Sequence, residues 1–121
     1  MREKFQKMSE ILLNSFANPE DSKLATLAKA TLLRTGADQA AALRDTTGRT
    51  YVAINIQAPA LLLDAAQAVF TVATASQISG IESVVIAGEK VAHIEVISDN
   101  SPQATIFHID ANEAITVLAG I

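Results

Sequence analysis

Residues Gly48 to Ala75 decide the fold, and they read GRTYVAINIQAPALLLDAAQAVFTVATA. Gly48 can adopt positive φ in a turn, so Ala40–Arg44 and Arg49–Ile56 on either side of it are predicted to pair as a β-hairpin. From Pro59 to about Gln77 apolar residues then occupy every face of a helix, which must therefore be covered on all sides. The stretch thus predicts a hairpin followed by a buried helix.

Two further helices are predicted before this stretch. Apolar residues at helical spacing, such as Phe5 and Leu12, predict an amphipathic helix at about residues 2–16. Asn18 then provides an N-cap and Gly36 a C-terminal stop for a second helix.

The carboxyl-terminal part indicates strands and one more helix. Glu82–Ala87 is a nearly continuous apolar run, as in a sheet interior. Val91–Ile97 and Thr105–Asp110 alternate apolar and polar residues and are predicted to form a hairpin with one solvated face. Asp110 and Glu113 resemble a capping box, so a short helix is predicted after them. Its apolar residues are Ile115, Val117 and Leu118.

Composition places the chain among single-domain globular proteins. Its 121 residues are enough to bury roughly two thirds of the unfolded surface, and 50% of them are hydrophobic. We expect one α/β domain over residues 1–121, with helices on both faces of the sheet.

Charge and cysteine content exclude several partners and sites. Residues 1–49 carry eight basic and six acidic groups, whereas residues 50–121 carry one basic and seven acidic groups. Without a basic cluster of any size, nucleic acid is not expected as a partner. Polar residues interrupt the uncharged stretch Ala65–Ile81, so no membrane span is expected. The chain has no cysteine and no signal-peptide pattern, which favours a cytoplasmic location.

Three segments of the chain look like parts of one enzyme family. They are Ala40-Ala41-Ala42-Leu43, Gly48-Arg49-Thr50-Tyr51 and Asn55-Ile56-Gln57. In this order, the region from Asp21 to Ala87 resembles the first half of the cytidine deaminases. The resemblance implies a three-layer sheet with helices on both faces, and an Asn-Ile-Gln segment placed to contact a nucleoside ribose.

The chain departs from that family at the metal site. Cytidine deaminases hold a catalytic zinc with a Cys/His-Ala-Glu motif at the start of the buried helix and with a later Pro-Cys-x-x-Cys motif. The first motif would fall within Leu63–Ala68, where no such triplet occurs, and Gln57 replaces the usual Glu. After Ala87 the second motif has no counterpart, and a hairpin strand is expected in place of its helix. We therefore expect a cytidine-deaminase-like protein without cofactor or deaminase activity.

Asn55, Gln57 and Asp64 are the candidate ligand-binding residues. Asp64 is the only charged residue between Arg49 and Glu82. It either lines a cleft, where it would bind an amine or the edge of a base, or serves as a first-turn acid that stabilises the helix dipole.

A second constellation offers metal-ligating side chains, namely His93, Glu95, His108 and Asp110. Period-two spacing would place each pair on one strand face, and a hairpin would bring the pairs together. Alternatively, these four residues are the solvated face of a hairpin whose other face, with Ile94, Val96, Phe107 and Ile109, contacts the core.

We predict a non-catalytic module that binds a nucleoside-like ligand or another protein. Two alternatives remain: a zinc-dependent nucleoside deaminase or hydrolase with non-standard ligands, and a purely structural oligomeric subunit. The apolar helix from Ala60 to Gln77 also predicts a homo-oligomer, a dimer or tetramer, with Val69 and Phe70 at the interface.

Overall fold

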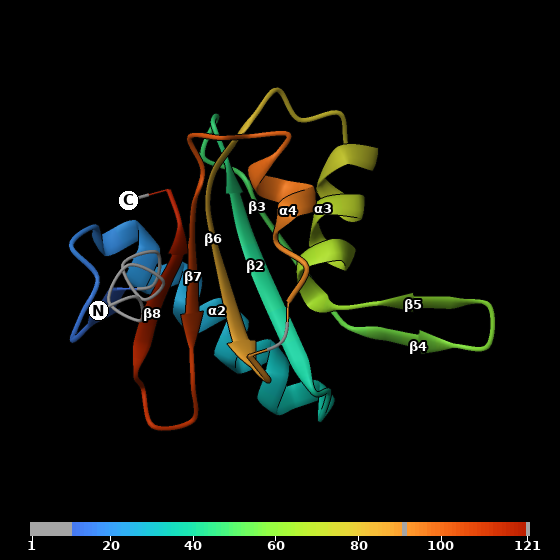
Figure 1. Cartoon of the computed structure of the whole chain (residues 1–121), viewed down its shortest axis with the longest axis horizontal. Helices are drawn as coiled ribbons and strands as arrows, with labels where there is room; N and C mark the ends of the chain where they lie inside the picture. Colours follow the sequence, from blue (N-terminus) through green and yellow to red (C-terminus); the bar gives the residue numbers. More distant parts are fainter. Residues whose placement is uncertain (1–10, 91, 121) are drawn as a thin grey trace, which may run out of the picture.

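The computed structural model describes residues 11–90 and 92–120, which form a six-stranded sheet with helices on both faces (Figure 1). Along the sheet the strands lie in the order β1-β8-β7-β6-β2-β3. Their bounds are β1 Ile11–Leu13, β2 Gln39–Asp45, β3 Thr50–Ile54, β6 Ile81–Gly88, β7 Thr105–Ile109 and β8 Ile115–Ala119. Neighbouring strands are antiparallel except β6 and β7, which are parallel. Within the described residues, no helix combines the length and apolar character that a membrane crossing requires.

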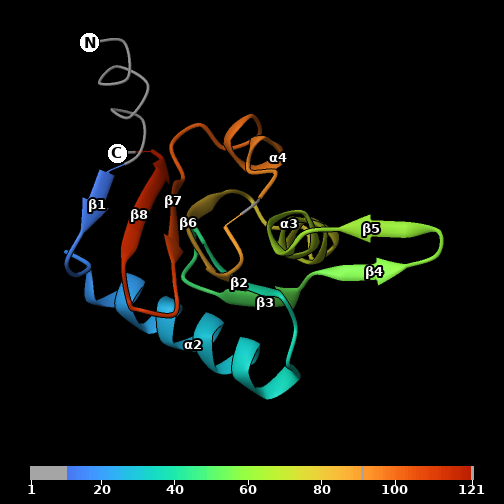
Figure 2. The ribbon, with the colours of Figure 1, turned by 60° about the horizontal axis from the view of Figure 1, so that its bottom comes forward.

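The helices form two layers around the sheet (Figure 2). α2, Pro19–Thr35, covers one face, whereas α3, Ala65–Ala75, and the short α4, Glu95–Ser98, cover the other. Successive residues of β2 contact opposite layers: Ala41 packs in the cluster on the α3 side and Ala42 in the cluster on the α2 side. The predicted α/β architecture with helices on both faces is therefore confirmed.

The helix predicted between Asn18 and Gly36 is confirmed as α2. Asn18 Oδ1 accepts a hydrogen bond of 2.9 Å from the Glu20 amide, and Gly36 ends the helix with a φ of 68°. Local capping signals alone located both ends of this helix, because they satisfy its free terminal amides and carbonyls.

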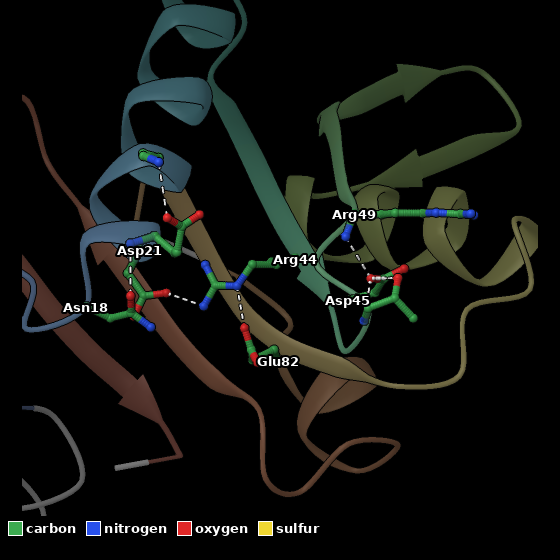
Figure 3. A network of polar contacts seen from close by, with 9 residues as sticks. Asn18, Asp21, Arg44, Asp45, Arg49 and Glu82 are labelled. Carbon is green, nitrogen blue, oxygen red and sulfur yellow. Dashed lines mark hydrogen bonds and ion pairs between the residues drawn. The ribbon is translucent and has the colours of Figure 1, made fainter.

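A buried arginine connects α2 to the sheet (Figure 3). Arg44 of β2 donates from Nη2 to Asp21 Oδ1 over 2.8 Å and from Nε to Glu82 Oε1 over 2.5 Å. Burial alone would lower the pKa of Arg44, but the hydrogen bonds and charges of Glu82 and Asp21 outweigh it and raise the pKa. The guanidinium thus remains charged while it joins the first turn of α2 to β6.

The predicted hairpin is confirmed as β2 and β3, with Asp45 organising its turn. Asp45 Oδ1 accepts hydrogen bonds from the Thr47 amide, the Thr47 hydroxyl and the Arg49 amide. Burial opposes ionisation of Asp45, but these bonds, with a longer one from Tyr51, hold the pKa of the carboxyl below its usual value. Gly48 adopts a φ of 93°, as the turn requires.

The helix predicted from Pro59 is shorter than expected. Ile56–Ala58 and Leu61–Leu63 instead form β4 and β5, a separate two-stranded hairpin with its turn at Pro59-Ala60. The helix begins only after Asp64, which closes a capping box with Gln67. Pro59 suits a turn as well as a first helical position, and the run of leucines fits either structure. One face of α3 is exposed, including Val72, so the helix is not covered on all sides.

The predicted amino-terminal helix is wrong where the structure describes it. Residues 2–10 lie outside the described residues, but Ile11–Leu13 form β1, which pairs antiparallel with β8. Phe16, the last residue of the predicted helix, packs edge-to-face on Phe107 with 5.0 Å between ring centroids. Pairing with an open sheet edge has overridden helical periodicity here.

The hairpin predicted from Val91–Ile97 and Thr105–Asp110 does not form. Residue 91 is not described, residues 92–94 form no regular element, and α4 follows, packed beside α3. β7 pairs with β6 and β8 instead, and it is buried on both faces, so its alternation of residue types does not mark a solvated face. A short helix therefore occupies the place at which we expected a hairpin strand.

The last predicted helix is strand β8. Asp110 Oδ1 accepts hydrogen bonds from the Asn112 amide over 2.8 Å and from the Ala114 amide over 2.9 Å, which closes the turn between β7 and β8. Glu113 has a φ of 67°, which a helix excludes. Aspartate favours turns and helix starts by the same side-chain acceptance, so the residue pattern did not distinguish them.

Candidate functional site

A hollow of about 230 Å³ lies at the amino-terminal end of α3. We call it the α3 hollow. Residues from four segments line it: Asp38 and Gln39 at the start of β2, Asn55, Ile56, Gln57, Leu62 and Leu63 from the end of β3 and the β4–β5 hairpin, Asp64 and Gln67 at the start of α3, and Glu89 and His93 after β6. The structure thus brings together all three candidate residues, Asn55, Gln57 and Asp64, and adds His93 to them.

Asp64 uses both carboxylate oxygens within the protein. Oδ1 accepts a hydrogen bond of 2.9 Å from the Gln67 amide, and Gln67 Oε1 accepts one of 3.0 Å from the Asp64 amide. Oδ2 accepts from the backbone amide of His93 over 2.5 Å and lies 2.6 Å from its Nδ1. Asp64 is therefore the N-cap of α3 rather than a first-turn acid, and its Oδ2 contacts the imidazole of His93.

Asn55 and Gln57 hold the opposite wall of the hollow. Asn55 is half-buried and its Oδ1 accepts from the Gln39 amide over 3.0 Å, which leaves Nδ2 as its hydrogen-bond donor for a ligand. Gln57 lies in β4 and is exposed, so its amide can both donate and accept.

Sequence analysis missed Gln39, which is 3% exposed. Its Oε1 accepts from the Ala65 amide over 3.0 Å, and its Nε2 donates to the Glu89 carbonyl over 2.7 Å. The side chain therefore touches both the start of α3 and the segment after β6. The sequence feature that could have identified Gln39 is a polar residue directly before three alanines, on the same strand face as Ala41.

The alternative metal set is not brought together. His93 contacts Asp64 at the α3 hollow, and Glu95 begins α4. His108 is buried in β7, where Nε2 lies 2.8 Å from the Gly88 carbonyl, and Asp110 closes the β7–β8 turn. Neither reading of these residues as one face of a hairpin holds, because that hairpin does not form. In the part of the chain that the structure describes, no group of three or more His, Cys, Asp or Glu side chains converges on a metal position.

A zinc ion of the cytidine deaminase kind does not fit the α3 hollow. At the start of α3 the chain places Ala65, Ala66 and Ala68, which have no side-chain donor atoms, beside Asp64 and Gln67, which bond to each other. Zinc requires three or four thiolate, imidazole or carboxylate ligands at about 2.0 to 2.3 Å. Asp38, Glu89 and His93 also line the hollow, but no group of three or more His, Cys, Asp or Glu side chains in the described residues converges on a metal position, so the hollow lacks a ligand set.

The charge of the α3 hollow favours neutral or cationic molecules. Asp38, Asp64 and Glu89 contribute carboxylates, and none of its lining residues, all within the described chain, is a lysine or arginine. An anionic group would meet unfavourable charge here.

One known family matches a span of the chain that contains most of these elements. The family model described as "Cytidine deaminase-like" matches residues 17–113, a span that contains α2, the β2–β3 hairpin, α3 and the whole α3 hollow. No curated protein matches the sequence significantly. Because the match extends over most of the chain and over the elements that build the hollow, the chain belongs to the cytidine deaminase-like family.

Proposed function

We propose that this protein binds a small, polar, nucleoside-like molecule in the α3 hollow and does not deaminate it. One observation carries the proposal: separate segments place the amides of Asn55 and Gln57 and the imidazole of His93 around a single hollow. At about 230 Å³ this hollow is smaller than the roughly 300 to 1,000 Å³ of sites for drug-sized ligands. Amides there can read the hydroxyl groups of a ribose without a metal.

Hydrolytic deamination needs an activated water and a carboxylate that moves its proton. At the α3 hollow the Asp64 carboxylate accepts hydrogen bonds on both oxygens, and Gln57 and Gln67 carry amides. The hollow also contains the Asp38 and Glu89 carboxylates and the His93 imidazole, but within the described residues no group of three such side chains holds a metal position from which a water would be acidified. The donor set therefore favours a binding role over the alternative of a deaminase or hydrolase with non-standard ligands.

The binding proposal is tested by titrating the protein with cytidine, uridine and adenosine while the side-chain amide signals of Asn55 and Gln57 are followed by NMR. We expect both signals to shift at millimolar nucleoside. Asn55→Asp keeps the oxygen that accepts from the Gln39 amide but removes the Nδ2 donor, so it should weaken binding about tenfold. Asn112→Asp, in the exposed β7–β8 turn, is the matched control. Unchanged signals with all three nucleosides would refute a nucleoside site.

The absence of deaminase activity is tested separately. We expect purified protein to release no uridine from cytidine and to carry no molar equivalent of zinc, because the α3 hollow lacks a zinc ligand set. Zinc-dependent production of uridine would overturn this expectation and restore the enzymatic alternative.

The β4–β5 hairpin favours a second role in self-association. It projects away from the sheet (Figure 1), and its Ile56, Leu61 and Leu62 side chains are 36%, 49% and 74% exposed. Isolated two-stranded hairpins are marginally stable in water, so cover from another subunit would stabilise this one. Of the two interface residues predicted from the sequence, Val69 is fully buried in its own core and Phe70 packs against that core. We therefore place the homo-oligomer interface at the hairpin instead.

The α3 hollow is open, and Leu62 and Leu63 line it without filling it. A purely structural subunit would be favoured by a cleft packed with leucines, so the open hollow supports a binding role. The lack of cysteine supports a cytoplasmic site of action for this module.

A further inference from the structure

Two sets of hydrogen bonds join the start of α3 to the segment that follows β6. Gln39 makes the first set, to the Ala65 amide and the Glu89 carbonyl. Asp64 makes the second set, to the backbone amide and Nδ1 of His93. Both sets therefore bridge the same two segments, and all three side-chain partners, Gln39, Asp64 and His93, line the α3 hollow.

In the first set, the bond to Ala65 is buried. Gln39 is 3% exposed, and Ala65, whose amide donates to it, is fully buried, whereas Glu89 is exposed. If the carboxamide were removed, the Ala65 amide hydrogen would lose its partner away from water, which is costly. The Gln39 side chain thus carries an interaction that nearby solvent cannot replace.

The second set lies closer to solvent but involves a carboxylate. The Asp64 side chain is 11% exposed and that of His93 is 59% exposed. Because Asp64 also caps α3 through the Gln67 amide, its position is fixed by the helix before it meets His93. A nearly buried carboxylate on a defined helix end therefore holds the segment at His93.

We infer that Gln39, Asp64 and His93 form a metal-independent junction that holds the start of α3 to the segment after β6. Among the described residues, no group of three or more His, Cys, Asp or Glu side chains at the junction could hold a metal ion. Through its main chain Gln39 also pairs with Asn55, so the junction fixes the third wall of the α3 hollow as well. This inference does not require the hollow to bind a ligand.

Gln39 is the positioning residue of the junction, and amide hydrogen exchange at Ala65 reports on it directly. In Gln39→Met we expect exchange at Ala65 to accelerate about tenfold or more, because the acceptor is lost. Gln39→Glu keeps the acceptor for the Ala65 amide but places a nearly buried carboxylate against the Glu89 carbonyl oxygen, so the protein should lose stability while Ala65 stays protected in the folded state. Gln103→Met, at an exposed position away from the junction, is the control and should leave amide exchange at Ala65 unchanged.

The second set is tested with Asp64→Asn. The asparagine can still cap α3 with its oxygen, so the Gln67 amide should stay protected, while the amide that replaces Oδ2 cannot accept from His93. We expect exchange at the His93 amide to accelerate while exchange at Gln67 does not. This variant keeps the inference testable if Gln39→Met fails to fold.

The inference is decided by whether amide protection at the junction depends on a metal ion. Wild-type protein treated with a chelator should show unchanged protection at Ala65 and His93, and addition of zinc should not increase it. Loss of protection at Ala65 on chelation, or unchanged exchange at Ala65 in folded Gln39→Met, would overturn the junction as we describe it.

Discussion

Asp64 accepts hydrogen bonds on both oxygens, from the Gln67 amide of its own helix and from His93, 29 positions later in the chain. A lone acid before a run of alanines indicates either a helix start or a ligand contact. The structure shows that Asp64 caps its helix and that its Oδ2 is engaged by His93. The neutral groups of the α3 hollow that can meet a ligand are Asn55, Gln57 and the imidazole, beside the carboxylates of Asp38 and Glu89.

Gln57 provides a test at a single side chain. Gln57→Glu restores the carboxylate of the cytidine deaminases at an exposed position of the α3 hollow. A charged acceptor forms stronger hydrogen bonds with hydroxyl groups, so nucleoside affinity should rise by about fivefold. Gln103→Glu adds the same charge outside the hollow and should leave affinity unchanged. Equal titration curves for the two variants would show that Gln57 does not contact the ligand.

At the level of elements, local signals predicted α2 and the β2–β3 hairpin, and runs of apolar or alternating residues predicted strands at β6 and β7. The pairing of β7 and the strands β1 and β8, which depend on distant partners, were missed. The caps of α2 and the turn at Gly48 act within a few residues. By contrast, β7 is a strand between β6 and β8, and its burial on both faces depends on residues far away in the chain. The site followed the same division: Asn55 and Gln57 lie beside the predicted hairpin, but Gln39 and His93 meet α3 only through tertiary contacts.

The β2–β3 turn provides the test at this scale. The pKa of Asp45 is lower in the folded protein than its ordinary value of 3.8, so its ionisation stabilises the fold above about pH 4, and this stabilisation disappears as the pH falls through the folded pKa. Asp45→Asn should therefore lower the Tm relative to wild type at pH 7, and the difference should shrink toward pH 3. Asp99→Asn, at an exposed position just after α4, is the control. A difference in Tm that is constant with pH would contradict the role of the charge.

On the molecule as a whole, exposed leucines occur in two settings, on the projecting β4–β5 hairpin and on α2. Leu61, 49% exposed, lies on the hairpin, whereas Leu33, 86% exposed, lies on α2. Leu61 shares one face of the hairpin with Ile56 and Leu63, because Ile56 pairs with Leu63 and Ala58 pairs with Leu61. Contiguous apolar surface is the property that distinguishes an interface from a scattered exposed residue.

Sedimentation measurements test this difference. Leu61→Asp would bury an unpaired carboxylate at the interface that we propose, a cost of several kcal/mol, and should convert the oligomer to monomers. Leu33→Asp should leave the oligomer intact and the fold unchanged. Wild-type protein that sediments as a monomer at micromolar concentration would refute self-association.

The pairing of β1 with β8 has a consequence for biosynthesis. Ile11 lies opposite Val117, so the β1 edge of the sheet joins the two ends of the described chain. While a ribosome is still producing the chain, β1 has no strand to pair with, although α2 and the β2–β3 hairpin can already form from local contacts. The sheet is therefore completed only once β8 has been synthesised, and an unpaired β1 segment remains open to other strands until then.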